Sequence, residues 1–230
     1  MKKEVIKGIK TALPVVLGYI PIGLAFGILA SQQGLTILDI FFMSLFVYAG
    51  SAQFIASAMI ASEAAVVTII FTTFLVNLRH LLMSASLSQH LKHLSSPIQA
   101  LIGIGVTDET FAAGLTESSK GEASPYYYMG LHSTSHISWI VSTVLGGVLG
   151  NNIPNPEKWG LGFALSAMFI GLLFMQIKNK TDILVGLFAG VISLTLAIFF
   201  KNNFNIIIAS VLAAALGVCV EQWKQRSLSL

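Results

Sequence analysis

Charged side chains are scarce in this sequence. They make up 10% of its 230 residues, whereas 55% of the residues are hydrophobic and the mean hydropathy is +0.80. A water-soluble domain typically has about 25% charged residues, so this chain has too few to cover a soluble globule. Its apolar residues fall into repeated long runs, which is typical of membrane-spanning helices. We therefore predict an all-α, polytopic transmembrane helix bundle.

Cysteine is almost absent as well. Cys219 is the single cysteine and lies in the last apolar run, which excludes an intramolecular disulfide and a cysteine-based metal cluster. The basic residues flank the apolar runs and form no stripe among aromatic residues, so the net charge of +3 does not indicate a nucleic-acid partner. We expect a lipid bilayer around the chain, and nothing in the sequence points to a cofactor.

Charged stretches and stretches rich in Gly, Pro or Asn divide the chain into about eight candidate spans. They cover residues 12–30, 36–61, 65–87, 97–116, 128–150, 159–177, 183–200 and 203–220. If both termini are cytoplasmic, the basic residues inside are Lys2, Lys3, Lys7, Lys10, Lys120, Lys178, Lys180, Lys224 and Arg226, and those outside are Lys92, Lys158 and Lys201. This excess inside favours that orientation. We see no convincing internal repeat and interpret residues 1–230 as a single integral membrane domain.

The first span contains residues that disturb helices. Pro14 and Pro21 each remove a backbone hydrogen bond, so we expect this span to be kinked. Gly23 and Gly27 are four residues apart, a spacing that also allows tight packing against another helix.

Small and polar residues also interrupt the second span near its middle, at Gly50, Ser51, Ala52 and Gln53. We expect this span to be interrupted, or to be a re-entrant pair, because unwound backbone within a bilayer must face protein, substrate or water. Many transporters bind their substrates at such breaks, with the N-terminus of a half-helix facing the substrate carboxylate. We predict a binding site here, facing Pro21 and Gly23 of the first span. Tight packing of small residues is the alternative.

Charged residues lie inside the third and fourth spans. A charge near the bilayer centre costs on the order of 2.5–3.5 kcal/mol on insertion scales, so it must be paired, hydrated or functional. Arg79 needs a carboxylate, and Asp108 or Glu109 is the nearest in sequence. One of the two acids then lacks a strong partner, and desolvation favours its neutral form. Asn77 and His80 share another face of the third span, which suits the bundle interior or an aqueous path, and we include Asn77 among the predicted substrate-binding residues. The charges are either a coupling network or a structural clamp.

The fifth span carries His132 and His136, one helical turn apart. A metal site is not indicated, because no acid or cysteine lies near them in sequence to complete the coordination. Hydrogen bonding between helices, or a proton relay, suits these residues better.

Four motifs occur in a fixed order between residues 14 and 112. They are Pro14-x3-Gly18-x2-Pro21-x-Gly23-x2-Phe26-Gly27, Ala49-Gly50-Ser51-Ala52-Gln53-Phe54, Asn77-Leu78-Arg79-His80-x-Leu82-Met83 and Thr107-Asp108-Glu109-x-Phe111-Ala112. In order and spacing they resemble the AzlC family, the large subunit of bacterial branched-chain amino acid exporters. The resemblance implies a plasma-membrane permease that exports branched-chain and related hydrophobic amino acids. It also implies a small membrane partner of the AzlD type.

Two other classes of function stay open at this point. Ser51 with His132 or His136 would be the dyad of an intramembrane serine protease, although the serine lacks a G-x-S-x-G elbow. A channel or scaffold subunit is the other alternative, and saturable, stereoselective flux of leucine separates a carrier from both.

Overall fold

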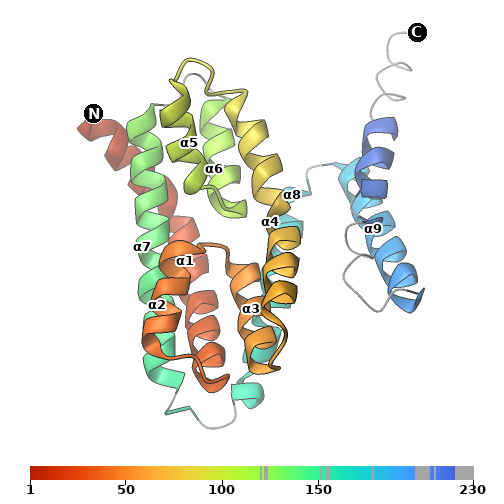
Figure 1. Cartoon of the computed structure of the whole chain (residues 1–230). Helices are drawn as coiled ribbons and strands as arrows, with labels where there is room; N and C mark the ends of the chain where they lie inside the picture. The colour runs from red at the N-terminus through yellow and green to blue at the C-terminus, as the bar shows by residue number, and fades with distance from the viewer. Residues whose placement is uncertain are drawn as a thin grey trace. The chain divides into compact units, whose positions relative to one another are not determined.

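A computed structural model describes residues 1–119, 121, 124–150, 152–153, 156–177, 179–199, 208–209 and 211–220 (Figure 1). Within these residues every regular element is a helix, which confirms the all-α prediction. The chain divides into two compact units, Met1–Met168 and Phe169–Leu230. That the whole chain acts as one domain stays a prediction. The candidate site lies in the first unit.

The first unit is built from long helices and half-helices. Its elements are α1 (Lys2–Gln32), α2 (Ile37–Phe46), α3 (Gly50–Ala61), α4 (Val66–Ser88), α5 (Ser96–Ile104), α6 (Asp108–Ser118), α7 (Pro125–Gly150), η1 (Pro156–Trp159), η2 (Leu161–Phe163) and the start of α8 (Ala164–Gln176). The predicted second span is interrupted, as expected. The fourth, predicted as one span over 97–116, is also two half-helices. Each half-helix extends roughly 14–18 Å, about half of the hydrocarbon thickness.

The first pair of half-helices forms a hairpin whose tip lies at mid-height of α1. Tyr48, at the break, contacts Tyr19, and Phe54 of α3 contacts Phe26, so α3 runs parallel to α1. Figure 1 shows α2 approaching the tip and α3 returning to the end where α4 begins. The hairpin therefore enters from the end where α1 finishes.

The second pair forms a hairpin that enters from the opposite end. Glu109, at the start of α6, bonds to Tyr19, and Glu117, near its end, pairs with Lys7, so α6 runs antiparallel to α1. Figure 1 shows α5 descending to the same level before α6 returns. The tips of both hairpins thus meet at mid-height of the first unit.

A long helix followed by two half-helices therefore occurs twice, in opposite directions. The first copy is α1 to α3 and the second is α4 to α6, and three residues join the half-helices in each copy, 47–49 and 105–107. This is the arrangement of an inverted-topology repeat. The chain therefore contains an internal structural repeat, contrary to the sequence-based expectation of none.

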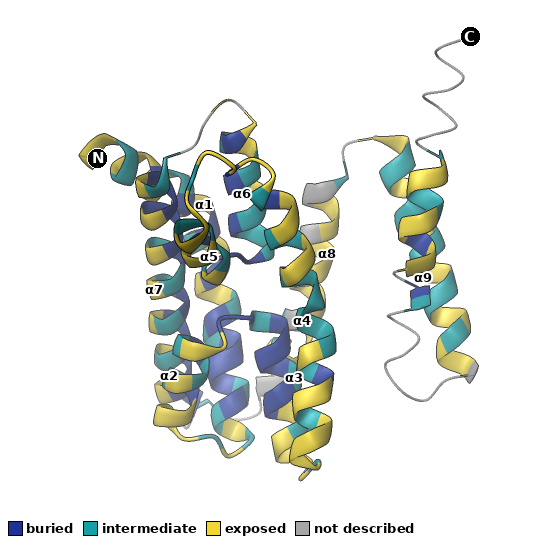
Figure 2. Cartoon of the chain, turned by 45° about the horizontal axis from the view of Figure 1, so that its top comes forward, coloured by how far each residue is buried: buried dark blue, intermediate teal, exposed yellow. Residues whose placement is uncertain are grey.

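Helix α7 runs parallel to α1 and packs closely against it. A Cβ added at Gly27 would overlap the backbone of Thr143 and Gly147, and one added at Gly146 would overlap the backbone of Leu24. Small residues are required where two helix backbones approach this closely. Figure 2 shows buried residues along α1, α3 and α7. Helix α1 is continuous through Pro14 and Pro21.

The second unit contains the end of α8, helix α9 (Lys180–Phe199) and the short apolar helix Val211–Val220. By length and composition, three helices among the described residues suffice to cross a membrane: Lys2–Gln32, Val66–Ser88 and Lys180–Ile198. The predicted span at 203–220 begins in residues outside the described ones.

Reporter fusions distinguish two hairpins from two continuous spans. The loop with Glu63 lies at the same end of the first unit as Leu35, whereas the loop with Lys92 lies at the end where α1 begins. The lysines at that end are Lys2, Lys3, Lys7, Lys10 and Lys92, so we expect it to be cytoplasmic. The placement of Lys92 outside, which followed from counting residues 36–61 and 97–116 as single spans, is therefore wrong. Fusions after Leu35 and after Glu63 should both report the outer side, and one after Lys92 should report the cytoplasm. Opposite sides for Leu35 and Glu63 would mean that residues 36–61 cross the membrane.

Candidate functional site

A small cavity lies where the two hairpin tips meet. Its volume is about 20 Å³, which is room for about one water molecule. The residues around it come from α1, both tips, α4 and α7: Tyr19, Tyr48, Ala49, Gly50, Ser51, Arg79, His80, Thr107, Asp108, Glu109 and Trp139. Segments far apart in the chain thus supply one polar site in a bundle that is otherwise largely apolar.

The first tip is held in an unusual backbone conformation. Tyr48 has φ +25°, outside the regions that residues with a Cβ readily adopt. Its ring stacks on His136 with centroids 4.0 Å apart, and the Nε2 of His136 lies 3.0 Å from the carbonyl oxygen of Ser44. Packing against α7 therefore holds the break in this conformation. The next half-helix, α3, begins at Gly50.

The second tip is fixed by its own threonines. The backbone N–H of Thr107 donates to the Thr110 hydroxyl at 2.8 Å, and the N–H of Thr110 donates to the Thr107 hydroxyl at 3.3 Å. This reciprocal cap begins α6. Asp108 and Glu109 follow in the first turn, where the helix dipole stabilises negative charge.

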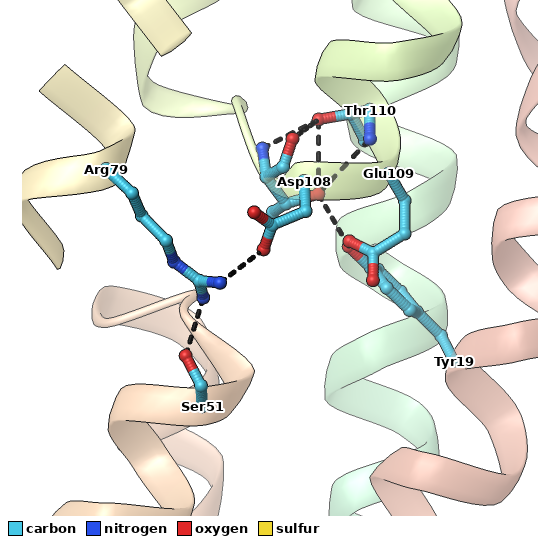
Figure 3. Close-up of polar contacts among 7 residues, drawn as sticks. Tyr19, Ser51, Arg79, Asp108, Glu109 and Thr110 are labelled. Atoms are coloured by element: carbon cyan, nitrogen blue, oxygen red, sulfur yellow. Dashed lines mark hydrogen bonds and ion pairs between the residues drawn. The ribbon is translucent and has the colours of Figure 1, made fainter. Parts of the chain in front are cut away.

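An ion pair and a hydrogen bond of Arg79 join α4 to the two hairpins (Figure 3). The Nη1 of Arg79 lies 2.8 Å from the Oδ2 of Asp108, and its Nη2 donates to the hydroxyl of Ser51 at 2.5 Å. The side chains of Arg79 and Asp108 are 25% and 15% exposed, so solvent screens the pair only weakly. One guanidinium therefore connects α3, α4 and α6.

Glu109 has a different partner from Asp108. The Tyr19 hydroxyl donates to the Oε2 of Glu109 at 2.9 Å and lies 2.7 Å from the hydroxyl of Thr107 (Figure 3). Because an ionised carboxylate only accepts, Tyr19 donates to Glu109 and accepts from Thr107. The two neighbouring acids thus face opposite sides of the tip, one towards a cation and one towards a phenol.

The structure brings together some of the residues predicted from sequence. Six of them line the cavity: Gly50, Ser51, Arg79, His80, Asp108 and Glu109. Ala52 and Gln53 are buried beside it. Gln53 accepts from the Trp139 indole N–H at 2.8 Å and donates to the Ser44 hydroxyl at 3.1 Å, so its amide positions the tip and the aromatic wall.

Three other predicted binding residues do not line the cavity. Pro21 lies on the exposed face of α1, and Gly23 is buried against Ser142 of α7. Asn77 lies on α4, and its buried Oδ1 makes no hydrogen bond among the described residues. Tight packing, the alternative raised for the glycines of the first span, describes the surroundings of Gly23.

The two histidines of α7 each contact one hairpin. His136 bonds to α2 and stacks on Tyr48, as described above. His132 packs against Gly105 at the second break and beside the ring of Tyr128. Its Nε2 is buried without a hydrogen-bond partner among the described residues. Neither histidine lines the cavity. Both instead pack against the breaks between the half-helices, on the side away from the cavity lining.

Several residues around the cavity were missed from the sequence, namely Tyr19, Tyr48, Thr107 and Trp139. Two threonines three residues apart before an apolar stretch resemble a helix cap, which was a usable signal for Thr107. Aromatic residues in an apolar span give no such signal, because lipid-facing and buried aromatics look alike in sequence.

The geometry argues against a serine nucleophile. Ser51 accepts a hydrogen bond from the guanidinium of Arg79, which cannot take up its proton. Within the described part of the chain, no three His, Cys, Asp or Glu side chains are placed to hold a metal ion.

Comparison with known proteins identifies the family. Residues 14–153 match the family model for the AzlC protein. The chain belongs to the AzlC family. Inner membrane protein YgaZ of Escherichia coli is 34% identical over 197 residues, which cover 80% of this chain and 80% of the relative. The branched-chain amino acid transport protein AzlC of Bacillus subtilis is 28% identical over 211 residues, or 90% of this chain and 80% of the relative. No solved structure matches the chain.

This AzlC-family chain is therefore a membrane protein related to amino acid transport, and its family is not one of enzymes. An uncharacterized membrane protein of Helicobacter pylori, 29% identical over 214 residues, is similar across 91% of this chain and 93% of its own length. Similarity of that extent includes both hairpins and the helices beyond them.

Proposed function

We propose that this chain is the large subunit of an exporter of branched-chain and related hydrophobic amino acids. It resides in the bacterial plasma membrane with both termini in the cytoplasm, and it works by ion-coupled alternating access. The Bacillus subtilis relative is named as a branched-chain amino acid transport protein, and this supports the substrate class. Two hairpins that enter from opposite ends meet at one cavity lined by charged residues. This observation is the main support for the mechanism.

The size of the cavity supports alternating access. A volume of about 20 Å³ is too small for an amino acid, since sites for small molecules usually measure roughly 300 Å³ or more. The substrate is admitted when one hairpin tip withdraws from the other, and released when the opposite tip withdraws. The two hairpins enter from opposite ends, so these movements open the site to opposite sides of the membrane in turn.

Glu109 is the group that we assign to proton coupling. It is bonded to Tyr19 and, unlike Asp108, forms no ion pair among the described residues. A carboxyl group in this position gains or loses a proton without breaking the clamp between Arg79 and Asp108. His80, which lines the same cavity, and His136 are the next candidates.

A small membrane subunit of the AzlD type completes the transporter. A chain with so few long helices offers little surface for enclosing a gated cavity. We expect saturable, stereoselective leucine flux in liposomes that contain both subunits, and little flux with this chain alone. Uptake of radiolabelled L-leucine, with D-leucine as the control, is the measurement. Full flux without the partner would contradict this part of the proposal, and flux that never saturates would indicate a channel.

The same liposomes test the coupling when a pH gradient is imposed. A Glu109→Gln chain still accepts a hydrogen bond from Tyr19 but exchanges no proton at this position. Its leucine flux should lose the response to the gradient, while exchange of leucine across the membrane persists. An undiminished pH response would move the coupling role to a histidine.

A further inference from the structure

Helix α3 begins beside the cavity without a side chain to cap it. Its N-cap residue is Ala49, which has no acceptor in its side chain, and the first helical bond runs from the N–H of Gln53 to the carbonyl of Ala49. The N–H groups of Gly50, Ser51 and Ala52 therefore have no acceptor within the helix. By contrast, α2 and α6 both start with reciprocal side-chain caps, Thr36 with Asp39 in α2 and Thr107 with Thr110 in α6.

The same helix end carries a positive charge. The Arg79 guanidinium donates to the Ser51 hydroxyl in the first turn of α3, and Gly50 and Ser51 both line the cavity. Free N–H groups and the positive end of the helix dipole form an anion site, and arginine binds carboxylates with two parallel hydrogen bonds. Asp108 is already bound to Arg79 here, which shows that a carboxylate fits beside this guanidinium.

A buried phenol at the cavity provides an independent indication. Tyr48 is 8% exposed and lines the cavity, and although its hydroxyl interacts with that of Tyr19, it has no partner at hydrogen-bond distance and angle among the described residues. Its ring is fixed by stacking on His136. A buried donor without a well-placed acceptor is unfavourable, so a ligand that accepts a hydrogen bond from it is favoured.

The start of α6 has the opposite character. Its N–H groups are partly satisfied by the threonine cap, and the side chains that it presents to the cavity are those of Asp108 and Glu109. The start of α3 thus offers hydrogen-bond donors to the cavity, and the start of α6 offers hydrogen-bond acceptors.

We propose that the N-terminus of α3, with the Arg79 guanidinium and the Tyr48 hydroxyl, binds the carboxylate of a zwitterionic amino acid. The acids at the start of α6 receive its ammonium group. This assignment rests on the proposed function and adds the orientation of the substrate. It requires a free α-carboxylate on the substrate, so leucinamide, which keeps the ammonium group and the side chain, should bind much less tightly.

Two variants test this assignment in the complex with the small subunit, by calorimetric titration with L-leucine and L-leucinamide. In Ala49→Ser, the new hydroxyl caps α3 and competes with the ligand for its N–H groups. In Tyr48→Phe, only the phenol oxygen is removed. We expect leucine affinity to fall about tenfold or more in each variant, and leucinamide affinity to stay unchanged. Ala65→Ser is the matched control, because Ala65 is the uncapped N-cap of α4 in an exposed loop.

The outcomes separate this assignment from the proposed function. If wild type binds leucine and leucinamide equally, or if both variants keep wild-type affinity for leucine, the assignment is wrong and amino acid transport still stands. If wild type binds no branched-chain amino acid, the proposed function fails and the assignment fails with it. Thermal unfolding of each variant checks that it is folded. If Ala49→Ser does not fold, the leucine affinity of Tyr48→Phe alone tests the assignment.

Discussion

Replacing Gly50 with leucine should abolish leucine transport while the protein is still inserted and expressed. A Cβ added at Gly50 would lie 3.0 Å and 3.2 Å from two ring carbons of Trp139, already closer than most real Cβ contacts. The ring has little freedom to move, because its indole N–H is bonded to Gln53 and it packs against Tyr19. A leucine side chain must therefore fill the cavity of about 20 Å³ between the tips.

The size of the substitution should set the size of the effect. Gly50→Ala adds only the Cβ, so we expect partial loss of transport, with more loss in Gly50→Leu. Gly18→Leu is the matched control on α1, because nothing lies within 4 Å of a Cβ at Gly18, next to the cavity residue Tyr19. Radiolabelled leucine flux, normalised to the amount of inserted protein, is the measurement. Normal flux in Gly50→Leu would remove this segment from the site.

The break in the second span was predictable because its sequence departs locally from an apolar helix. Gly50, Ser51 and Gln53 interrupt the apolar run, and lipid cannot satisfy unwound backbone. The break in the fourth span was not recognised, because Asp108 and Glu109 were interpreted as charges within a continuous helix. In the structure they occupy the first turn of α6, after a threonine cap.

The inverted repeat escaped detection because it is preserved in spacing and not in residue identity. The half-helices of the two copies have 10 and 12 residues, and 9 and 11 residues, with three residues at each break. Lipid-facing positions accept almost any apolar side chain, so two copies can diverge in sequence while their lengths persist.

Which charged residues meet was only partly predictable. Sequence proximity suggested Asp108 or Glu109 for Arg79, but the choice depends on the direction in which each side chain leaves the first turn of α6. Consecutive helical residues point about 100° apart, which takes Asp108 towards α4 and Glu109 towards Tyr19 of α1. Gly23 shares the Tyr19 side of α1, but it lies one turn further along, where Ser142 covers it. The sequence pattern predicts which face of a helix a residue lies on, but not whether the residue lies at the height of the cavity.

Neutralising Arg79 alone should destabilise the protein more than neutralising Arg79 and Asp108 together. Arg79→Gln leaves the Asp108 carboxylate without its cation between two helices, and breaking a buried pair costs roughly 3–5 kcal/mol. Asp108→Asn leaves the guanidinium without its anion at a similar cost. A double-mutant cycle on thermal unfolding should therefore show strong coupling, with the double variant recovering part of what each single variant loses.

The pair between Lys7 and Glu117 is the internal control for this cycle. It also joins two helices, but the Lys7 side chain is 50% exposed. Exposed pairs typically contribute about 0.2–1 kcal/mol, so Lys7→Gln and Glu117→Gln should be nearly additive. Strict additivity for Arg79 and Asp108 as well would show that they do not interact in the membrane, and Glu109 or the small subunit would become the partner of Arg79.

Leucine flux through the double variant separates a structural clamp from a transport site. If the pair only holds α4 against α6, restoring stability by neutralising both residues should also restore flux. If Arg79 binds the substrate carboxylate, the Arg79→Gln, Asp108→Asn protein should regain stability but not flux, because Gln carries no charge for the carboxylate. We expect the second result. A double variant that transports leucine at the wild-type rate would make the pair purely architectural, and the carboxylate would then depend on the N–H groups of α3 and the Tyr48 hydroxyl alone.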